Sequence, residues 1–234
     1  MPETVAPAVR DRLVLALDTD DLVDALRLAR DLEPWFAVAK VGLELFSATG
    51  PEVVTALCDR GWRVFLDLKL HDIPTTVSKA ARVLGALGGN YLTLHAHGGP
   101  DMLRAGVEGL HVGAEQAGLD PPVAVAVTIL TSDDSAPPHI LGKRVAAAVE
   151  GGCGGIVCAA ADVREAKQLA PRMVAVVPGI RLVGMETHDQ ARASSPEAAI
   201  AAGADLLVVG RTVTAAADRA AAAAAVAGAV AAAS

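Results

Sequence analysis

Short runs of Val, Leu, Ile and Ala alternate along the chain with stretches of helical periodicity. Nearly continuous apolar runs bounded by polar residues are typical of strands that are buried on both faces, as in a parallel sheet. Eight such runs are predicted as strands: residues 13–18, 36–40, 63–69, 91–96, 123–130, 155–159, 173–179 and 205–210.

The intervening segments are predicted as helices. Pro51, Pro74 and Pro196 fall where the first turn of a helix tolerates proline. The predicted helices cover residues 21–32, 51–60, 74–87, 99–117, 141–150, 162–169 and 196–202, and the Ala-rich C-terminal segment.

Eight strand-then-helix units predict an α/β protein with a single (β/α)8 TIM barrel. We expect one domain over residues 1–234, with a short N-terminal extension at residues 1–11. The alternative is a doubly wound open sheet. Such a sheet normally has a glycine-rich turn after its first strand, and the sequence L-A-L-D-T-D-D (15–21) contains no glycine.

Composition narrows the classes of partner. Apolar residues make up 53% of the chain but aromatic residues only 3%, so the core must be aliphatic. The net charge is −7 and no run of Lys or Arg occurs, which argues against nucleic acid or an anionic membrane as partner. Cys58, Cys153 and Cys158 form no C-x-x-C pair, and the N-terminus has no apolar signal region. We therefore expect structural thiols in a cytoplasmic protein without a membrane span.

Charged residues close the first three predicted strands, at the end of the barrel where such enzymes place their sites. These residues are Asp18, Lys40, and Asp67 with Lys69. Asp67 and Lys69 are two apart, so their side chains should leave the same side of the strand. Two interpretations remain open at this point: a catalytic cluster, or an ion-pair network that caps the barrel mouth.

Asp72 and Asp18 also have simpler local interpretations. Either could cap the start of the helix that follows it, because Asp is a common capping residue. For Asp72, capping is favoured on local grounds.

Glycine and arginine follow strands seven and eight, in V-V-P-G-I-R (176–181) and V-V-G-R-T (208–212). Barrels often bind phosphate in these two loops, and Arg211 could donate two hydrogen bonds to a phosphate dianion. The long polar loop after Arg181 is typical of a lid, and Gln190 lies within it. Gly210 belongs to the same group of candidate phosphate contacts.

Histidines provide a weaker signal. His95 and His97 have the spacing of a metal pair on a strand, but no third histidine or carboxylate completes the set in the sequence. A structural role is therefore favoured, and the other histidines show no spacing pattern.

The segment D-L-K-L-H-D-I-P-T-T (67–76) resembles the signature D-x-K-x-x-D-I-P-x-T of the orotidine 5′-monophosphate decarboxylase family. Ile73-Pro74 distinguishes this signature from that of the magnesium-using sugar-phosphate decarboxylases and hexulose-phosphate synthases. The resemblance covers almost the whole chain, through A-L-D (16–18), A-K-V-G (39–42), L-H-A-H-G-G (94–99), V-T-I-L-T-S (127–132), V-P-G-I-R (177–181), T-H-D-Q (187–190) and V-V-G-R-T-V-T (208–214).

The resemblance implies decarboxylation of orotidine 5′-monophosphate to uridine 5′-monophosphate, the last step of de novo pyrimidine biosynthesis, without metal or cofactor. It implies that Lys69 protonates C6 and that Asp67 lies beside the scissile carboxylate. Lys40 would hold the network and touch the ribose, and Asp18 would bind ribose hydroxyls.

The resemblance also implies a homodimer in which Asp72 and Thr76 reach the site of the neighbouring subunit. The remaining substrate contacts that it implies are Thr131 and, on the phosphate side, Arg181, Gln190, Gly210 and Arg211. A hydroxyl near the pyrimidine could come from Ser132 or Ser135, and the sequence does not decide between them.

Two alternatives to this function remain. One is a magnesium-dependent sugar-phosphate decarboxylase or aldolase of the same superfamily. The other is a catalytically silent nucleotide-binding barrel, against which the complete set of Lys40, Asp67, Lys69 and Asp72 argues.

Overall fold

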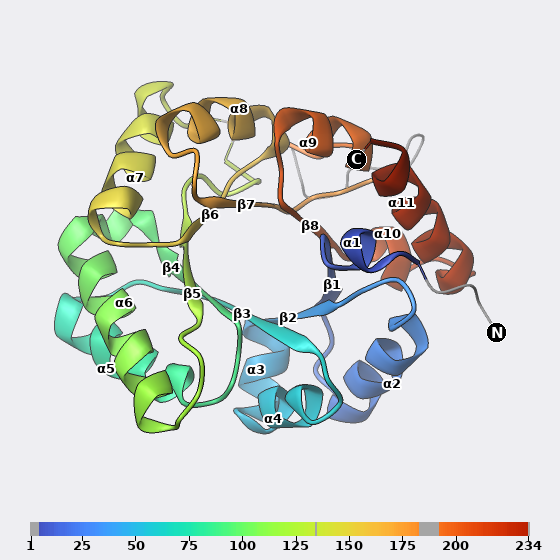
Figure 1. Cartoon of the computed structure of the whole chain (residues 1–234), viewed down its shortest axis with the longest axis horizontal. Helices are drawn as coiled ribbons and strands as arrows, with labels where there is room; N and C mark the ends of the chain where they lie inside the picture. Colours follow the sequence, from blue (N-terminus) through green and yellow to red (C-terminus); the bar gives the residue numbers. More distant parts are fainter. Residues whose placement is uncertain (1–4, 134, 183–191, 234) are drawn as a thin grey trace.

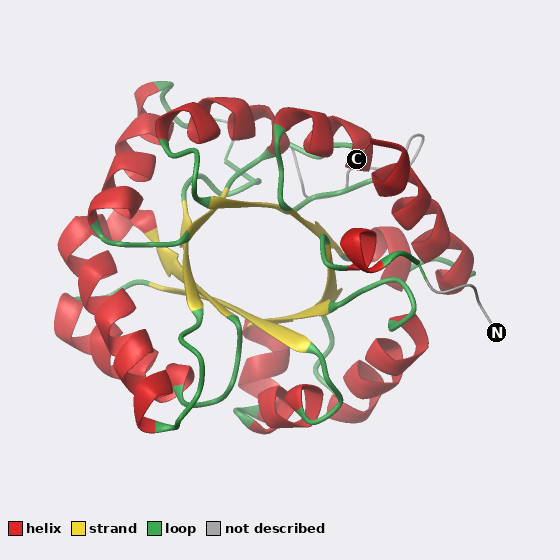
Figure 2. Ribbon diagram, viewed as in Figure 1, coloured by secondary structure: helices red, strands yellow, loops and turns green. Residues whose placement is uncertain are grey.

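Eight parallel strands form a closed barrel in the computed structural model, which describes residues 5–133, 135–182 and 192–233. Each strand pairs with its neighbours in chain order, and the pairing of Leu13 with Leu207 closes the barrel. Helices surround the barrel (Figures 1 and 2). The predicted (β/α)8 barrel is confirmed. The strands are β1 (Leu13–Leu17), β2 (Val38–Gly42), β3 (Arg63–Leu70), β4 (Tyr91–His95), β5 (Val123–Val127), β6 (Gly155–Val157), β7 (Val174–Val177) and β8 (Leu206–Val209).

The helices predicted from periodicity are all present, with some shifts at their ends. Pro74 and Pro196 open their helices as expected, whereas Pro51 immediately precedes its helix. These helices are α2 (Leu22–Leu32), α4 (Glu52–Cys58), α5 (Pro74–Gly85), α6 (Gly99–Gln116), α7 (His139–Glu150), α8 (Ala160–Leu169), α9 (Pro196–Ala202) and α11 (Arg219–Ala233).

Among the described residues, four short helices were not predicted. Three of them have at most four residues, too few to show a hydrophobic period. The four helices are α1 (Pro7–Arg10), α3 (Leu43–Thr49), the 3-10 helix η1 (Ala96–Gly98) and α10 (Arg211–Thr214). Helix α1 lies in the segment before the first strand and contacts α11.

The prediction that Lys40 ends its strand is wrong. Strand β2 continues through Val41 and Gly42, which pair with Leu66 and Asp67 of β3. The predicted run began too early because Phe36 is a buried apolar residue that precedes the strand.

The core has two parts, as expected for strands that are buried on both faces. One lies inside the barrel and is largely aliphatic around Phe65; the other lies between the outward strand residues and the helices. The Ala-rich α11 belongs to the outer part, where Val226 and Val230 are fully buried. Among the described residues, no helix combines the length and apolarity that crossing a membrane requires.

Candidate active site

A cavity of about 460 Å³ opens at the carboxyl ends of the strands. This volume suits a small-molecule ligand. Part of its wall is apolar and includes Phe65, Ile129 and Pro178. The polar side chains that line the cavity are Asp18, Lys40, Asp67, Lys69, Thr131, Arg181, Arg211 and Thr214.

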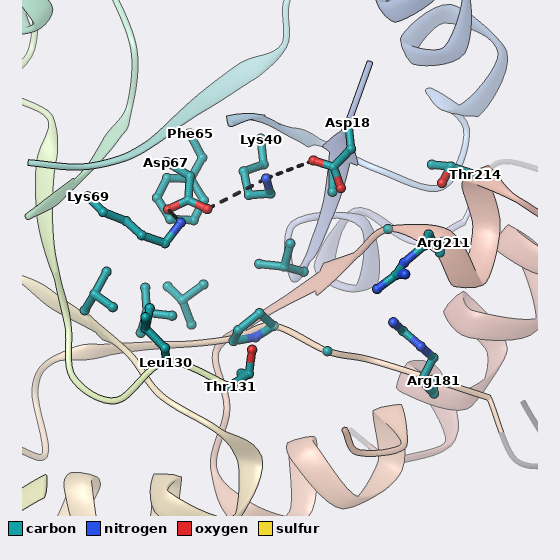
Figure 3. Close-up of a pocket in the computed structure, with 18 of the residues that line it drawn as sticks. Asp18, Lys40, Phe65, Asp67, Lys69, Leu130, Thr131, Arg181, Arg211 and Thr214 are labelled. Atoms are coloured by element: carbon teal, nitrogen blue, oxygen red, sulfur yellow. Dashed lines mark hydrogen bonds and ion pairs between the residues drawn. The ribbon is translucent and has the colours of Figure 1, made fainter. Parts of the chain in front are cut away.

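Four charged side chains form a row of alternating sign along one side of this cavity (Figure 3). Lys40 Nζ lies 3.3 Å from Asp18 Oδ1 and 3.7 Å from Asp67 Oδ2. Lys69 Nζ lies 2.9 Å from Asp67 Oδ1. The side chains of Lys40 and Asp67 are only 12% and 16% exposed. Each buried charge therefore has an opposite charge beside it, which offsets the cost of its desolvation.

Asp67 and Lys69 face the same cavity, as the two-residue spacing predicted, but an irregular strand brings them there. The register of β3 against β4 shifts between Leu66 and Leu70, and Lys69 has φ of 50°. Left-handed φ values are uncommon for residues other than glycine. Lys69 therefore sits in an unusual backbone conformation within the site.

Sequence reasoning missed Thr93, which contacts both of these residues. Its Oγ1 accepts a hydrogen bond from the Lys69 backbone N–H at 2.8 Å and lies 3.1 Å from Asp67 Oδ1. The available signal was one polar residue in the middle of the apolar run Y-L-T-L-H-A (91–96).

Arg181 and Arg211 lie at the other end of the cavity, after β7 and β8, and Figure 3 shows both guanidinium groups directed into it. Arg181 is 7% exposed, and its Nη1 donates to the Ile180 carbonyl at 2.9 Å. Thr212 Oγ1 donates to the same carbonyl at 2.6 Å, which ties α10 to the loop after β7. The loops carrying Gly179 and Gly210 complete this end, as the sequence predicted.

The local capping interpretations are wrong for both aspartates. Helix α2 is capped by Asp21, which accepts from the Asp24 N–H, while Asp18 pairs with Lys40. Helix α5 has Ile73 at its N-cap and no side-chain cap, because Asp72 Oδ1 accepts from the Ile73 N–H instead.

Several predicted contacts lie away from this cavity. Asp72 and Thr76 are exposed, and neither lines it. The same holds for Ser132 and for Ser135, whose hydroxyl donates to Asp133 Oδ1 at 2.9 Å. Gln190, with residues 183–191, falls outside the described residues.

Three histidines gather beside Lys69, although the sequence suggested only a pair. The ring of His71 lies 5.5 Å from those of both His95 and His97. Burial, together with nearby Arg144, lowers the pKa of His95 to about 4. Within the part of the chain that the structure describes, no three His, Cys, Asp or Glu residues are arranged to hold a metal ion.

The chain is similar to known proteins along nearly all of its length. The model of the family described as "Orotidine 5'-phosphate decarboxylase / HUMPS family" matches residues 11–226. A protein of Parasynechococcus marenigrum named orotidine 5′-phosphate decarboxylase is 44% identical over 93% of each chain. One of the same name from Thermobifida fusca is 45% identical over 88% of this chain and 90% of its own.

Solved structures agree with these similarities. The crystal structure of orotidine 5′-phosphate decarboxylase from Lactobacillus acidophilus superposes with a TM-score of 0.77 at 31% identity, covering 94% of this chain and 99% of the other. An uncharacterized conserved protein from Geobacillus kaustophilus gives a TM-score of 0.79 at 33% identity, covering 93% and 99%.

Proposed function

Because the chain belongs to the orotidine 5′-phosphate decarboxylase / HUMPS family and is a carboxy-lyase of pyrimidine biosynthesis, we propose that it decarboxylates orotidine 5′-phosphate without a metal ion, Lys69 protonating C6 of the pyrimidine. The observation that carries this proposal is the position of the Lys69 ammonium in the cavity, 2.9 Å from Asp67 Oδ1. An ammonium held in this way can both stabilise developing negative charge and supply a proton.

The two ends of the cavity suit the two ends of a nucleoside monophosphate. Arg181 and Arg211, with the backbone of the two glycine loops, would bind the phosphate. Asp18 and Lys40 would contact the ribose hydroxyls, and the pyrimidine would lie against the apolar wall near Thr131. This orientation directs C6 and its carboxylate toward Asp67 and Lys69.

The proposed reaction breaks the bond between C6 and the carboxylate carbon. The electron pair stays on C6 in the plane of the ring, where delocalisation into the π system is poor, and CO2 leaves. The Lys69 ammonium stabilises this carbanion and gives it a proton. Asp67 orients Lys69, and its charge disfavours the bound carboxylate relative to neutral CO2.

The arrangement around Asp67 supports a metal-free reaction. Lys69 lies against one carboxylate oxygen, and Lys40 is nearest to the other. A carboxylate that already has two ammonium neighbours is a poor ligand for Mg²⁺, because the ammonium groups repel a divalent cation. We therefore expect the activity to survive EDTA. Loss of activity in EDTA would instead favour a magnesium-dependent sugar-phosphate decarboxylase or aldolase.

We also propose that the active form is a homodimer. Asp72 and Thr76 flank Ile73 and Pro74 at the start of α5, and Ile73 is a large apolar residue that is 66% exposed in the single chain. A partner subunit covering this segment would bury Ile73 and bring Asp72 and Thr76 to its own cavity.

Lys69→Ala tests the proposed proton donor. Turnover should fall by roughly 100-fold to 10,000-fold, the range for loss of a general acid, while binding of uridine 5′-monophosphate is retained. Decarboxylation is followed by loss of substrate absorbance, and binding by calorimetry. Lys143→Ala, at an exposed lysine of α7, is the matched control and should behave as the wild type.

Two results would contradict these assignments. Near-wild-type turnover of Lys69→Ala would refute the role of this residue. Wild-type protein that binds uridine 5′-monophosphate but shows no turnover would instead indicate a catalytically silent nucleotide-binding barrel.

A further inference from the structure

The irregularity in β3 places three residues opposite one residue of β4. Leu66 pairs with Leu92, and the next pair joins Leu70 to Leu94. On the β4 side, residues 67–69 therefore lie opposite the single residue Thr93. A bulge of this kind displaces backbone groups from the regular ladder and redirects side chains. Here it carries Asp67 and Lys69, and Lys69 has φ of 50°.

Thr93 points into the barrel and is fully buried. Its neighbours Leu92 and Leu94 pack in the outer core, while Tyr91 contacts the core inside the barrel. Because side chains alternate along a strand, Thr93 projects inward like Tyr91. Its hydroxyl reaches the Lys69 backbone and the Asp67 carboxylate from within the barrel.

The Thr93 hydroxyl has one proton to donate and two lone pairs to accept. It accepts from the Lys69 N–H at 2.8 Å. Asp67 Oδ1 lies at 3.1 Å and the Leu66 carbonyl at 3.5 Å, so the carboxylate is the nearer acceptor for its proton. One hydroxyl therefore contacts the backbone of Lys69 and the side chain of Asp67 together.

We propose that Thr93 is a positioning residue for decarboxylation, holding the bulge and the Asp67 carboxylate in the arrangement that aims the Lys69 ammonium. This inference rests on the proposed roles of Asp67 and Lys69. Asp67 Oδ1 receives one hydrogen bond from Lys69 Nζ and one from Thr93, so the plane of the carboxylate is set from two directions.

Loss of the hydroxyl removes both restraints. The Lys69 N–H would then lose its partner in a partly buried place, which favours relaxation of the left-handed backbone. The ammonium would move with that backbone, and displacements of about 1 Å at a reacting centre reduce rates strongly. Substrate binding at the arginine end would be unaffected, because Arg181 and Arg211 follow β7 and β8, away from the bulge in β3.

The test compares Thr93→Val, which keeps the branched shape, with Thr93→Ser, which keeps the hydroxyl. In Thr93→Val, kcat for orotidine 5′-phosphate should fall by roughly 10-fold to 100-fold, as for loss of a hydrogen bond to a charged group. KM and the Kd for uridine 5′-monophosphate should stay within about threefold. Thr93→Ser should restore kcat to within about threefold of the wild type.

Thr128→Val is the matched control. Thr128 is another fully buried threonine, directly after β5, and its hydroxyl donates to the Val157 carbonyl at 2.8 Å. Its backbone carbonyl accepts from Arg144, a contact that valine would keep. This variant should keep wild-type kcat. If Thr93→Val does not fold, Thr93→Ala and Thr93→Ser differ only by the hydroxyl and provide the same comparison.

Wild-type turnover is measured first, so that failure of the proposed function is recognised separately. With an active wild type, wild-type kcat in Thr93→Val would overturn the inference. Equal losses of kcat in Thr93→Ser and Thr93→Val would also overturn it. So would a rise in KM and in the Kd for uridine 5′-monophosphate that accompanies the fall in kcat, since both results indicate a general structural role.

Discussion

Lys40 shows how single residues depend on their neighbours in this site. Its ammonium lies between the carboxylates of Asp18 and Asp67, and its side chain is largely buried. Removing it would leave two like charges facing each other in a partly desolvated place. The same balance holds at Asp67, whose carboxylate lies between two lysines. The charges of the row are therefore a unit, and substitutions within it should not be additive.

His95 predicts a dependence of stability on pH. Its pKa is about 4 in the folded protein against an ordinary value of 6.5. Between these values the unfolded chain binds more protons, so the free energy of unfolding rises with pH from about 4 to about 6.5 and falls on acidification. His95 Nδ1 also accepts from the His97 N–H at 3.2 Å, a bond that protonation of this nitrogen would remove.

Urea unfolding of wild type and His95→Gln at pH 7 and pH 4.5 measures this effect. On acidification the free energy of unfolding should fall by about 1 kcal/mol more in the wild type than in the variant. This is less than the full linkage value because the ring is partly exposed. His111→Gln, at an exposed histidine of α6, controls for loss of an imidazole. The prediction would be contradicted if the free energy of unfolding fell by the same amount in wild type and His95→Gln between pH 7 and pH 4.5.

At the scale of elements, helices α5 and α6 pack with their backbones in close contact. A Cβ atom on Gly109 would overlap the carbonyl oxygen of Ser78, and one on Gly113 would overlap that of Arg82. Helix α5 follows β3, which carries Lys69, and α6 follows β4, which carries Thr93. The tight packing of these helices therefore supports the two strands that carry Lys69 and Thr93.

Gly113→Ala should lower the free energy of unfolding by about 2 kcal/mol, since the helices must separate to admit the methyl group. Gly228→Ala is the matched control, because Gly228 lies in α11 with nothing within 4 Å of the added atom. There the substitution should stabilise the protein by about 0.5–1 kcal/mol through helix propensity. Equal stability of the two variants, measured by urea unfolding, would contradict close packing of α5 against α6.

At the scale of the whole molecule, the barrel brings together loops that are far apart in the chain. The charged row lies on or directly after the first three strands, and the arginines follow the last two. Barrel closure through the pairing of β1 with β8 brings both groups to one cavity. The segment from Asp72 to Thr76 lies outside this cavity and is exposed. The proposed homodimer gives that segment a function.

Mixing two inactive variants tests shared sites. In a heterodimer of Lys69→Ala and Asp72→Ala subunits, one site carries both substitutions and the other carries neither. After subunit exchange, a mixture of equal amounts should therefore regain about one quarter of wild-type activity. Recovery is measured as turnover before and after exchange. Activity that stays at the mean of the separate variants would contradict a site shared between subunits.

The strands along the chain and the charged residues near their ends could be predicted, because each depends on residues that are close together in the sequence. Apolar runs reveal buried strands, and Asp18, Asp67 and Lys69 stand out as polar residues close to where such runs end. The position of Lys40 within its strand was mistaken, because an apolar residue before a strand resembles the strand itself. The local interpretation of Asp72 as a cap is wrong, since a capping residue and an exposed loop aspartate have the same local sequence.

By itself, the sequence determined the eight-stranded barrel, the family and the row of charged residues, since periodicity and motif are properties of neighbouring positions. Only the tertiary structure decided the bulge at Lys69, the contact of Thr93 with Asp67, the grouping of His71 with His95 and His97, and the packing of Gly113 on Arg82. Each of these joins residues that are more than twenty positions apart or depends on strand register. Register and helix separation are set by packing across the whole barrel, which local sequence does not encode.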